Sequence, residues 1–230
     1  MQHFYFYKVH KHTAKMTDIK FEKRIYPSEL YMNVSITNNN KRSIIKLEFA
    51  YDTEQIYLSY YVTETLHASN NASLNKNFNR IVLKAGELLD PYLTSNNPKK
   101  QEIFLKLLEE LYRITNDIVL YTSYQIAKKL INEHSEKVWI SIYPFFDEGG
   151  VNFDVDLNYK LNSSEEVNES IWEFHIMIRF ILPKRYIKIE YNLDKKIKVP
   201  SYMFIELLER AYKVNNADDI LKLMSELEYE

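Results

Sequence analysis

Apolar side chains recur at every second position in several short segments near the start of the chain. Residues 31–37 place Met32, Val34 and Ile36 on one face, and residues 45–49 and 56–63 show the same period. Residues 4–9 also alternate, but both of their faces are aromatic or apolar. Period two with one polar face is typical of half-buried antiparallel strands. Polar turn sequences at 38–41 and 52–54 separate the segments, so the pattern predicts a four-stranded meander.

The hydrophobic period then changes to that of amphipathic helices. Ser73 is a suitable cap for a helix over residues 73–90, which Pro91 ends because it forces the residue before it out of the helical region. Asn97 and Pro98 match the N-cap and first position of the next helix. Its apolar stripe continues to about residue 131. A break at 115–117 would give two helices, and without one the segment is a single rod.

The second half of the sequence repeats this order. Strand-like alternation returns at 138–142, 151–157, 172–180 and 187–191. Ser201 is a suitable cap for a helix to about residue 214, and Asn216 with Asp219 resembles a capping box for a last helix. We therefore predict an α+β fold of two tandem β-β-β-β-α-α units, in which antiparallel meanders are backed by helices. The first unit spans 1–134 with the inserted helix at 73–90, the second spans 135–230, and both pack as one compact body.

The predicted helices of the two halves also match residue by residue at an offset of 100. The matching positions are Phe104, Leu107, Leu108, Glu109, Tyr112 and Asn116 against Phe204, Leu207, Leu208, Glu209, Tyr212 and Asn216. An internal duplication would explain this match. The alternative is that amphipathic helices share such residues by chance. The duplication predicts that each phenylalanine and tyrosine of these pairs is buried against the sheet of its own half.

The composition excludes several kinds of functional site. Cysteine is absent, which removes disulfides, thiolate metal sites and cysteine nucleophiles. Only three glycines occur, so no Walker A loop, dinucleotide fingerprint or nucleophile elbow is present. We expect no cofactor and no enzymatic activity. The bias toward Ile, Lys, Glu, Tyr and Asn resembles that of proteins from hyperthermophilic archaea and their viruses, so we predict an archaeal or archaeal-virus origin.

Two groups of residues could bind metal. His10 and His12 would point to one face of a strand, which suits a metal pair, although two histidines near a terminus are more often solvated. Asp154 and Asp156 share a strand face, as Mg²⁺ ligands of nucleases do. The polar outer face of a half-buried strand explains the two aspartates equally well. A metal-dependent nuclease around Asp154 and Asp156 is therefore one alternative function.

A second alternative is nucleic-acid binding. Tyr57 and Tyr61 share a strand face on which single-stranded bases could stack. Their own strand carries no lysine or arginine to hold a phosphate backbone. A basic stretch follows much later in the chain and consists of Lys184, Arg185, Lys188, Lys195, Lys196 and Lys198. Lysines that protect an edge strand from unwanted pairing are the simpler explanation of that stretch.

The preferred hypothesis is a non-catalytic binding or assembly protein that acts through protein–protein contacts. Strands with two apolar faces need cover on both sides, which predicts a homodimer. The formal net charge of −2 gives no global attraction to nucleic acid or anionic membranes. No segment is apolar enough to span a bilayer, so we expect no membrane partner and a cytoplasmic location.

Overall fold

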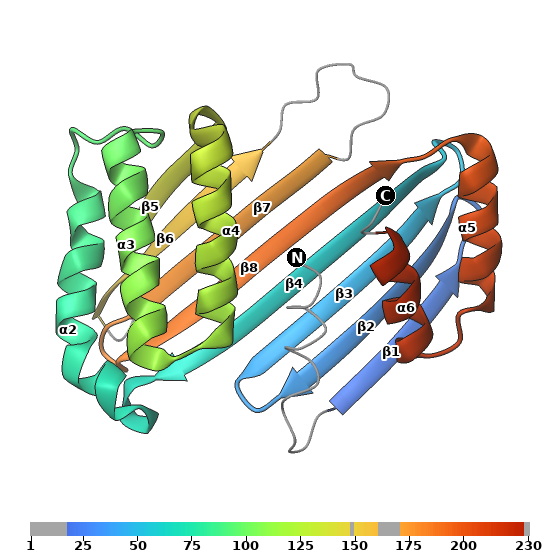
Figure 1. Ribbon diagram of the computed structural model, residues 1–230. Coiled ribbons are helices and arrows are strands. Elements are labelled where there is room, and N and C mark those ends of the chain that lie inside the picture. The colour runs from blue at the N-terminus through green and yellow to red at the C-terminus, as the bar shows by residue number, and fades with distance from the viewer. Residues whose placement is uncertain (1–17, 148–149, 161–170, 228–230) are drawn as a thin grey trace. The chain divides into compact units, whose positions relative to one another are not determined.

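The computed structural model describes residues 18–147, 150–160 and 171–227 (Figure 1). The elements in chain order are β1 (Asp18–Ile25), β2 (Glu29–Asn38), β3 (Lys41–Ala50), β4 (Gln55–His67), η1 (Ala68–Asn70), α2 (Ala72–Gly86), η2 (Glu87–Leu89), α3 (Pro98–Thr115), α4 (Ile118–His134), η3 (Ser135–Lys137), β5 (Val138–Asp147), β6 (Gly150–Lys160), β7 (Ile171–Ile181), β8 (Tyr186–Lys198), α5 (Ser201–Lys213) and α6 (Ala217–Leu227).

The eight strands form one sheet in the order β1-β2-β3-β4-β8-β7-β6-β5. The pairs β1–β2, β2–β3 and β5–β6 are antiparallel hairpin neighbours. The predicted α+β class with meander strands is confirmed. The duplication of the two halves stays a prediction.

The chain folds into two compact units, and each is built from more than one segment of the sequence. Unit 1 consists of Met1–Tyr61, Leu161–Glu173 and Asn192–Glu230, and unit 2 of Val62–Lys160 and Phe174–Tyr191. Strands β4 and β8 each contribute one part to unit 1 and the other to unit 2. The predicted boundary after residue 134 separates the two proposed sequence repeats, and it stays a prediction.

In unit 1, helices α5 and α6 pack on strands of the first meander (Figure 1). The ring centroids of Phe204 on α5 and Phe49 on β3 lie 5.9 Å apart, and both rings are buried. The expectation that Phe204 packs on the strands of its own half is therefore wrong. Tyr212, expected to be buried, is 43% exposed, and its hydroxyl lies 2.9 Å from that of Tyr51.

The two helices of unit 1 end on lysines that project from the sheet. Lys23 Nζ on β1 donates to the carbonyl oxygens of Tyr212 at 2.6 Å and Val214 at 2.9 Å, at the end of α5. Lys195 on β8 is buried, and its Nζ donates to the carbonyl oxygen of Leu227, the last residue of α6, at 3.3 Å. A cation at a helix C-terminus satisfies carbonyl groups that have no partner within the helix and interacts favourably with the helix dipole.

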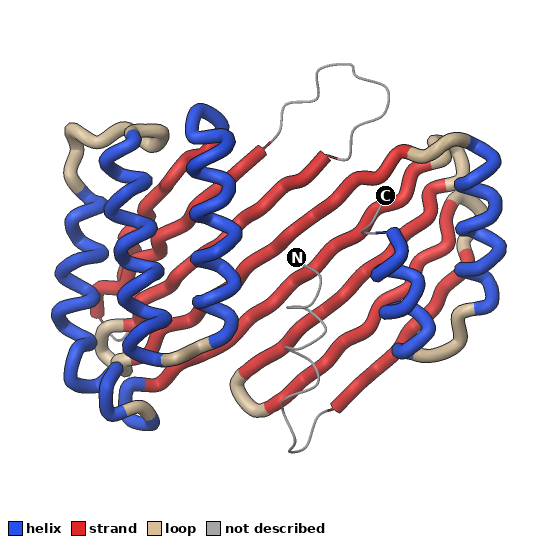
Figure 2. The backbone as a smooth tube through the Cα atoms, viewed as in Figure 1, coloured by secondary structure: helices blue, strands red, loops and turns tan. Residues whose placement is uncertain are grey.

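In unit 2, helices α2, α3 and α4 lie over the strands (Figure 2). Their core combines the alternate apolar positions of β5, β6 and β7 with the inner faces of the helices, including Ile140, Val155, Ile176, Phe104 and Leu120, all fully buried. Helix α3 contacts both α4 and β5. Full burial of such aliphatic and aromatic side chains stabilises the unit by about 1.5–3 kcal/mol each.

The helix boundaries follow local capping groups. Asn97 accepts a hydrogen bond from Lys99 N, with Pro98 at the first position, as predicted. Asn116 adopts the left-handed region (φ 52°) and ends α3, and Asp117 caps α4 through Leu120 N, so the open choice resolves as two helices.

Two of the predicted caps are wrong. Asn71, rather than Ser73, accepts the hydrogen bond from Leu74 N at the start of α2. Ser201 does not cap α5, because its hydroxyl donates to Glu54 instead. The capping box is borne out in part, since Asp219 N donates to the side chain of Asn216 at 3.0 Å.

Strand β1 was not predicted, and the strand expected at residues 4–9 lies outside the described residues. The alternation of β1 is Ile19, Phe21, Lys23 and Ile25 on one face and charged residues on the other. Lysine at an apolar-face position breaks the period that marks a half-buried strand. Lys23 is accommodated at this position because it donates to carbonyl groups at the end of α5, which lie far away in the sequence.

Candidate binding surface

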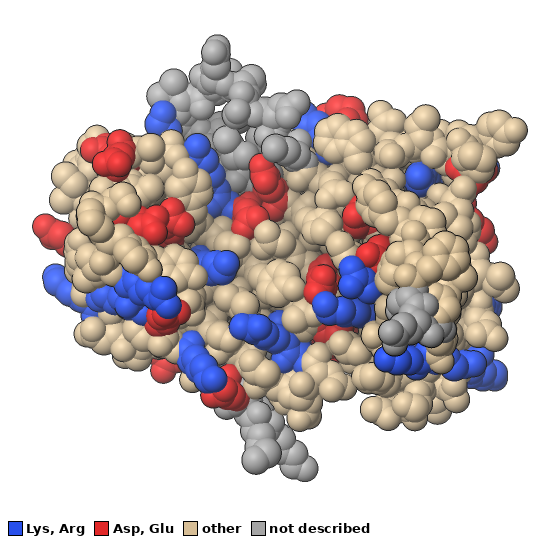
Figure 3. All heavy atoms as spheres, turned by 180° about the vertical axis from the view of Figure 1, so that it is seen from behind, with Lys and Arg blue, Asp and Glu red and all other residues tan. Residues whose placement is uncertain are grey.

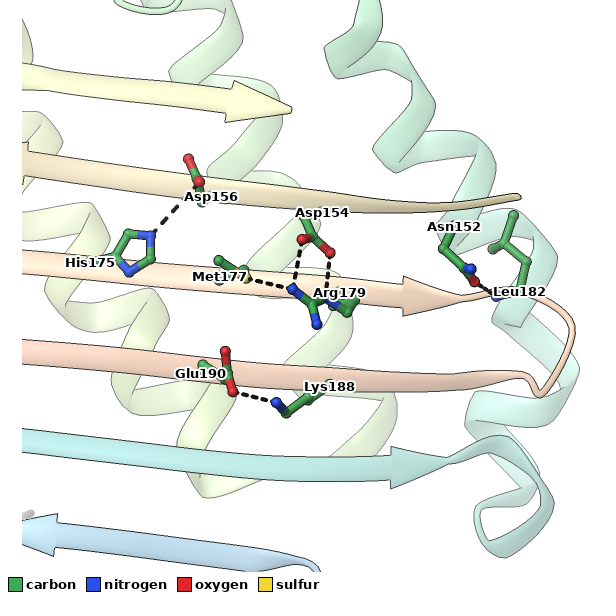
Figure 4. A network of polar contacts seen from close by, with 9 residues as sticks. All are labelled: Asn152, Asp154, Asp156, His175, Met177, Arg179, Leu182, Lys188 and Glu190. Carbon is green, nitrogen blue, oxygen red and sulfur yellow. Dashed lines mark hydrogen bonds and ion pairs between the residues drawn. The ribbon is translucent and has the colours of Figure 1, made fainter. Parts of the chain in front are cut away.

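The sheet of unit 2 has a polar face on the side opposite its helices. On β6, Phe153, Val155 and Leu157 are part of the buried core, and they alternate with Asn152, Asp154 and Asp156. Figure 4 shows these three polar side chains on the other face of the strand. The polar face continues on β7 with His175, Met177 and Arg179 and on β8 with Lys188 and Glu190. We call these eight residues the polar face of unit 2. The strand alternation of the sequence places them together because side chains two positions apart share a face.

Arg179 and Asp154 form the strongest interaction on this face. Arg179 Nε donates to Asp154 Oδ1 at 2.7 Å, and Nη2 donates to Oδ2 at 2.9 Å. The carboxylate raises the pKa of Arg179 further above its ordinary value. The guanidinium also stacks over the Phe145 ring at 5.4 Å and lies 3.7 Å from Met177 Sδ. Two parallel hydrogen bonds and a ring contact fix the orientation of this arginine.

Asp156 is buried on the same strand. Its Oδ1 accepts a hydrogen bond from Asn158 Nδ2 at 2.9 Å, and its Oδ2 lies 3.8 Å from His175 Nε2. The side chain of His175 is 37% exposed, whereas that of Asp156 is 7% exposed.

The remaining polar residues of the face are also tied to their neighbours. Asn152 is fully buried and accepts a hydrogen bond from Leu182 N at 3.1 Å, which ties β6 to the turn after β7. Lys188 Nζ lies 2.5 Å from Glu190 Oε1 on β8. The face is thus held by cross-strand and same-strand pairs.

Aromatic residues border this face along β5. Tyr143 is 57% exposed and lies directly opposite Asp154 in the β5–β6 register. Phe145, two positions further along the same strand face, is half-buried with Arg179 over its ring. Phe146 and Val151 are also exposed, but they lie opposite each other on the other face of the two strands. Tyr143, Asp154 and Arg179 therefore form one row across three strands. We call Tyr143 and Phe145 the apolar rim.

The geometry of the two aspartates bears on the nuclease alternative. Asp154 and Asp156 do share a strand face, but both oxygens of Asp154 accept hydrogen bonds from Arg179. Within the described residues, no group of three or more His, Asp or Glu side chains is arranged to hold a metal ion. His10 and His12, the other predicted metal ligands, lie outside the described residues. A cation at Asp154 would have to displace a positively charged guanidinium.

Tyr57 and Tyr61, the predicted stacking residues, lie half-buried on β4 in unit 1. The structure brings Lys196 of β8 to Tyr57, with its Nζ 5.8 Å from the centre of the Tyr57 ring. The sequence of β4 alone could not show this cation, because β8 pairs with β4 only in the folded sheet.

The other members of the predicted basic stretch are dispersed. Lys195 is buried at the end of α6, as described above. Arg185 has a positive φ of 48°, and its Nη2 donates to a main-chain carbonyl of α2 at 2.8 Å. Lys188 is paired with a glutamate, and Lys184 and Lys198 are exposed. Positive and negative side chains are interspersed on the side of the molecule seen in Figure 3.

No protein-family model, no curated protein and no solved structure matches the chain. Among the helices in the described part of the chain, none is long and apolar enough to cross a membrane. The function must therefore be inferred from the geometry of the polar face and its apolar rim.

Proposed function

We propose that this protein is a non-catalytic binding protein that acts through protein–protein contacts, and that the polar face of unit 2 with its apolar rim is the contact surface. The observation that carries the proposal is the row formed by Tyr143, Asp154 and Arg179. It places an exposed aromatic ring on the same strand face as an arginine whose orientation is fixed.

Tyrosine and arginine are the side chains that contribute most binding free energy in protein interfaces, together with tryptophan. Tyr143 presents a large ring with few rotatable bonds, so ordering it in a complex costs little conformational entropy. The side chain of Arg179 is 34% exposed, and two of its nitrogens are occupied by Asp154. Its remaining Nη1 group can donate to an acceptor on a partner. A partner with an apolar patch beside a carboxylate or carbonyl group fits this surface.

The pairing of the acidic groups favours contact over catalysis. A general base or a metal ligand needs an oxygen that is free to accept a proton or a cation. The carboxylates of Asp154 and Asp156 are instead engaged by Arg179, Asn158 and His175. Such satisfied networks make a surface rigid, which lowers the entropic cost of binding.

The proposal is tested by affinity capture from the native host with three baits: the wild type, Tyr143→Ala and Tyr92→Ala. Tyr92 is a matched control, because it is 90% exposed in unit 2 but lies after η2, outside the polar face and its rim. We expect a protein retained by the wild type and by Tyr92→Ala to be lost from Tyr143→Ala. A partner retained equally by all three baits would contradict the proposed surface.

We further propose that two copies of the chain associate, that the protein is cytoplasmic and that it is of archaeal or archaeal-virus origin. Self-association is supported by exposed apolar residues in unit 1, namely Ile19, Ile25, Tyr202 and Ile205. The origin rests on the composition alone.

Nucleic-acid binding is a second candidate function, favoured by the contact between Lys196 and Tyr57. A cation beside an aromatic ring supplies both elements of single-strand binding, a base-stacking platform and a phosphate contact. We expect any binding of single-stranded DNA or RNA to weaken with salt and to fall in Tyr57→Ala and Lys196→Ala. Lys106→Ala, an exposed lysine on α3, is the control. Unchanged binding in the first two variants would exclude this surface.

A further inference from the structure

The two edge strands of the sheet differ in how well they are protected. On β5, the main-chain N–H of Ile140 points away from β6, because it donates to the carbonyl oxygen of Ser95 at 2.8 Å. Main-chain groups two residues apart point the same way, so position 144 also faces outward, and Pro144 has no N–H to donate. An occupied N–H and an outward proline prevent another strand from pairing with β5.

Strand β1, the other edge, has no such protection. Among the residues that the structure describes, no strand pairs with β1 on the side away from β2. Its sequence contains no proline. An inward-pointing lysine on an edge strand often serves to prevent pairing, but Lys23 is committed to the carbonyl groups of Tyr212 and Val214. Its charge is therefore satisfied within unit 1.

The charges along one face of β1 alternate in sign. Asp18, Lys20, Glu22 and Arg24 occupy successive positions on this face, opposite to Ile19, Phe21 and Ile25. Their side chains are 62%, 74%, 42% and 57% exposed, respectively. Each charge is thus accessible to a neighbouring strand.

This order of charges is complementary to itself when two copies run antiparallel. If Phe21 of one copy lies opposite Phe21 of the other, Asp18 faces Arg24 and Lys20 faces Glu22. All four cross-strand contacts then join opposite charges, and no like charges meet. A shift of two residues in either direction would instead place like charges opposite each other, which is destabilising.

We propose that β1 is the surface through which two copies of this chain associate, by antiparallel pairing of β1 with β1 about a twofold axis at Phe21. The inference rests on the self-association proposed above and names its surface. The main-chain hydrogen bonds of the new strand pair supply affinity, and the charge order fixes the register. A twofold interface of this kind is closed and gives a dimer. Strand pairing does not extend the dimer into a larger assembly, because the other edge strand, β5, is protected.

The same side chains also make contacts within one strand. Lys20 lies 3.3 Å from Asp18, and Arg24 pairs with Glu22. Exposed pairs of this kind contribute little to stability. They nevertheless offer an alternative role for these charges, which is to pair only within one strand. The two roles can be told apart, because contacts within a strand and contacts between strands respond differently to charge reversal.

The test uses Lys20→Glu and Glu22→Lys, each in the full chain, and sedimentation velocity over a range of concentrations. Either substitution places like charges at two symmetry-related contacts, so we expect each variant alone to raise the dimer dissociation constant by about tenfold or more. In a mixture of the two variants, the glutamate introduced at position 20 of one copy would face the lysine introduced at position 22 of the other. The unchanged Glu22 of the first copy would face the unchanged Lys20 of the second. We therefore expect the mixture to form a heterodimer with affinity near that of the wild type.

The double variant Lys20→Glu/Glu22→Lys separates the two kinds of contact. It restores opposite charges between strands but places like charges next to each other within each strand, at 18 with 20 and at 22 with 24. Recovery of the dimer in the double variant and in the mixture supports pairing through β1. A wild-type dimer that none of these changes affects would overturn the β1 surface and leave self-association standing. A wild type that stays monomeric at high micromolar concentration would overturn both.

Discussion

Arg179 holds both carboxylate oxygens of Asp154, at 2.7 and 2.9 Å, across strands β7 and β6. The carboxylate is only 11% exposed, so removal of the guanidinium leaves a shielded charge without its main partner. This pair connects the apolar rim to the rest of the polar face, and the proposed binding surface depends on it.

We expect Arg179→Ala to lower the free energy of unfolding by about 2 kcal/mol, because the remaining aspartate is poorly solvated. The double variant Asp154→Asn/Arg179→Gln should lose less free energy of unfolding, because removing neutral amides from water costs less than removing a charge. Chemical denaturation measures both. Lys106→Ala is the control, as it breaks an exposed pair with Glu102 and should change stability little. Equal losses in all three variants would contradict the importance of the Arg179–Asp154 pair.

A second prediction concerns the lysine at the end of α5. Lys23→Met keeps the apolar stem but removes the donor to Tyr212 and Val214. We expect a loss of about 1 kcal/mol and faster amide hydrogen exchange in the last turn of α5. Lys46→Met, at an exposed position of β3, should leave both unchanged. Unaltered exchange in α5 after Lys23→Met would show that the lysine does not stabilise the helix end.

The contact between Phe49 and Phe204 predicts that a helix of the second half stabilises strands of the first. Phe204→Ala should lower the free energy of unfolding by about 3 kcal/mol, as expected for a buried ring. In a double-mutant cycle with Phe49→Ala, we expect a coupling of about 0.5 kcal/mol or more. Phe104→Ala, in unit 2, should be additive with Phe49→Ala. If the losses of free energy in Phe49→Ala and Phe204→Ala were also additive, the packing of these two rings would be contradicted.

Most strands can be predicted from the sequence, because only one of their two faces is buried. Met32, Val34 and Ile36 face a core while polar residues face away, and this difference is local. The exchange of helices between the halves could not be predicted, since no local pattern says which strands a helix covers. Phe204 has the same pattern whether it packs on β3 or on β7.

Only part of the polar face could be predicted from the sequence. Asp154 and Asp156 are recognisable in the sequence as acids on one strand face, but the sequence does not say which carboxylate Arg179 pairs with. Their pairing depends on the register between β6 and β7, which is a tertiary property. The available signal was that Arg179, like Asp154, occupies a polar position of an alternating strand, so the two could share a face.

The pH dependence of stability gives a fourth prediction. Burial raises the pKa of the Glu48 carboxyl above its ordinary value, and the neighbouring Glu29 carboxyl adds to this. The folded state therefore holds this proton more tightly than the unfolded state does. The stabilisation is complete below the ordinary pKa of glutamate and is lost as pH rises through the pKa of the folded state.

Glu48→Gln should accordingly raise the free energy of unfolding at neutral pH, and the gain should disappear in acid. Glu102 is the control of opposite sign, since its hydrogen bond from Lys106 lowers the pKa of the carboxyl. Glu102→Gln should bring no gain at neutral pH. Denaturation at several pH values tests both variants. A gain from Glu48→Gln that persists in acid would point to a cause other than the charge.

The central claim is that a protein partner binds the polar face and apolar rim of unit 2. Hydroxyl-radical footprinting of the wild-type chain, alone and in the complex recovered by affinity capture, tests it most directly because it reports the accessibility of individual side chains. We predict that Tyr143, Phe145 and Met177 lose reactivity in the complex while Tyr92 keeps it. Protection of Tyr92 with unchanged reactivity at Tyr143 and Met177 would contradict the claim.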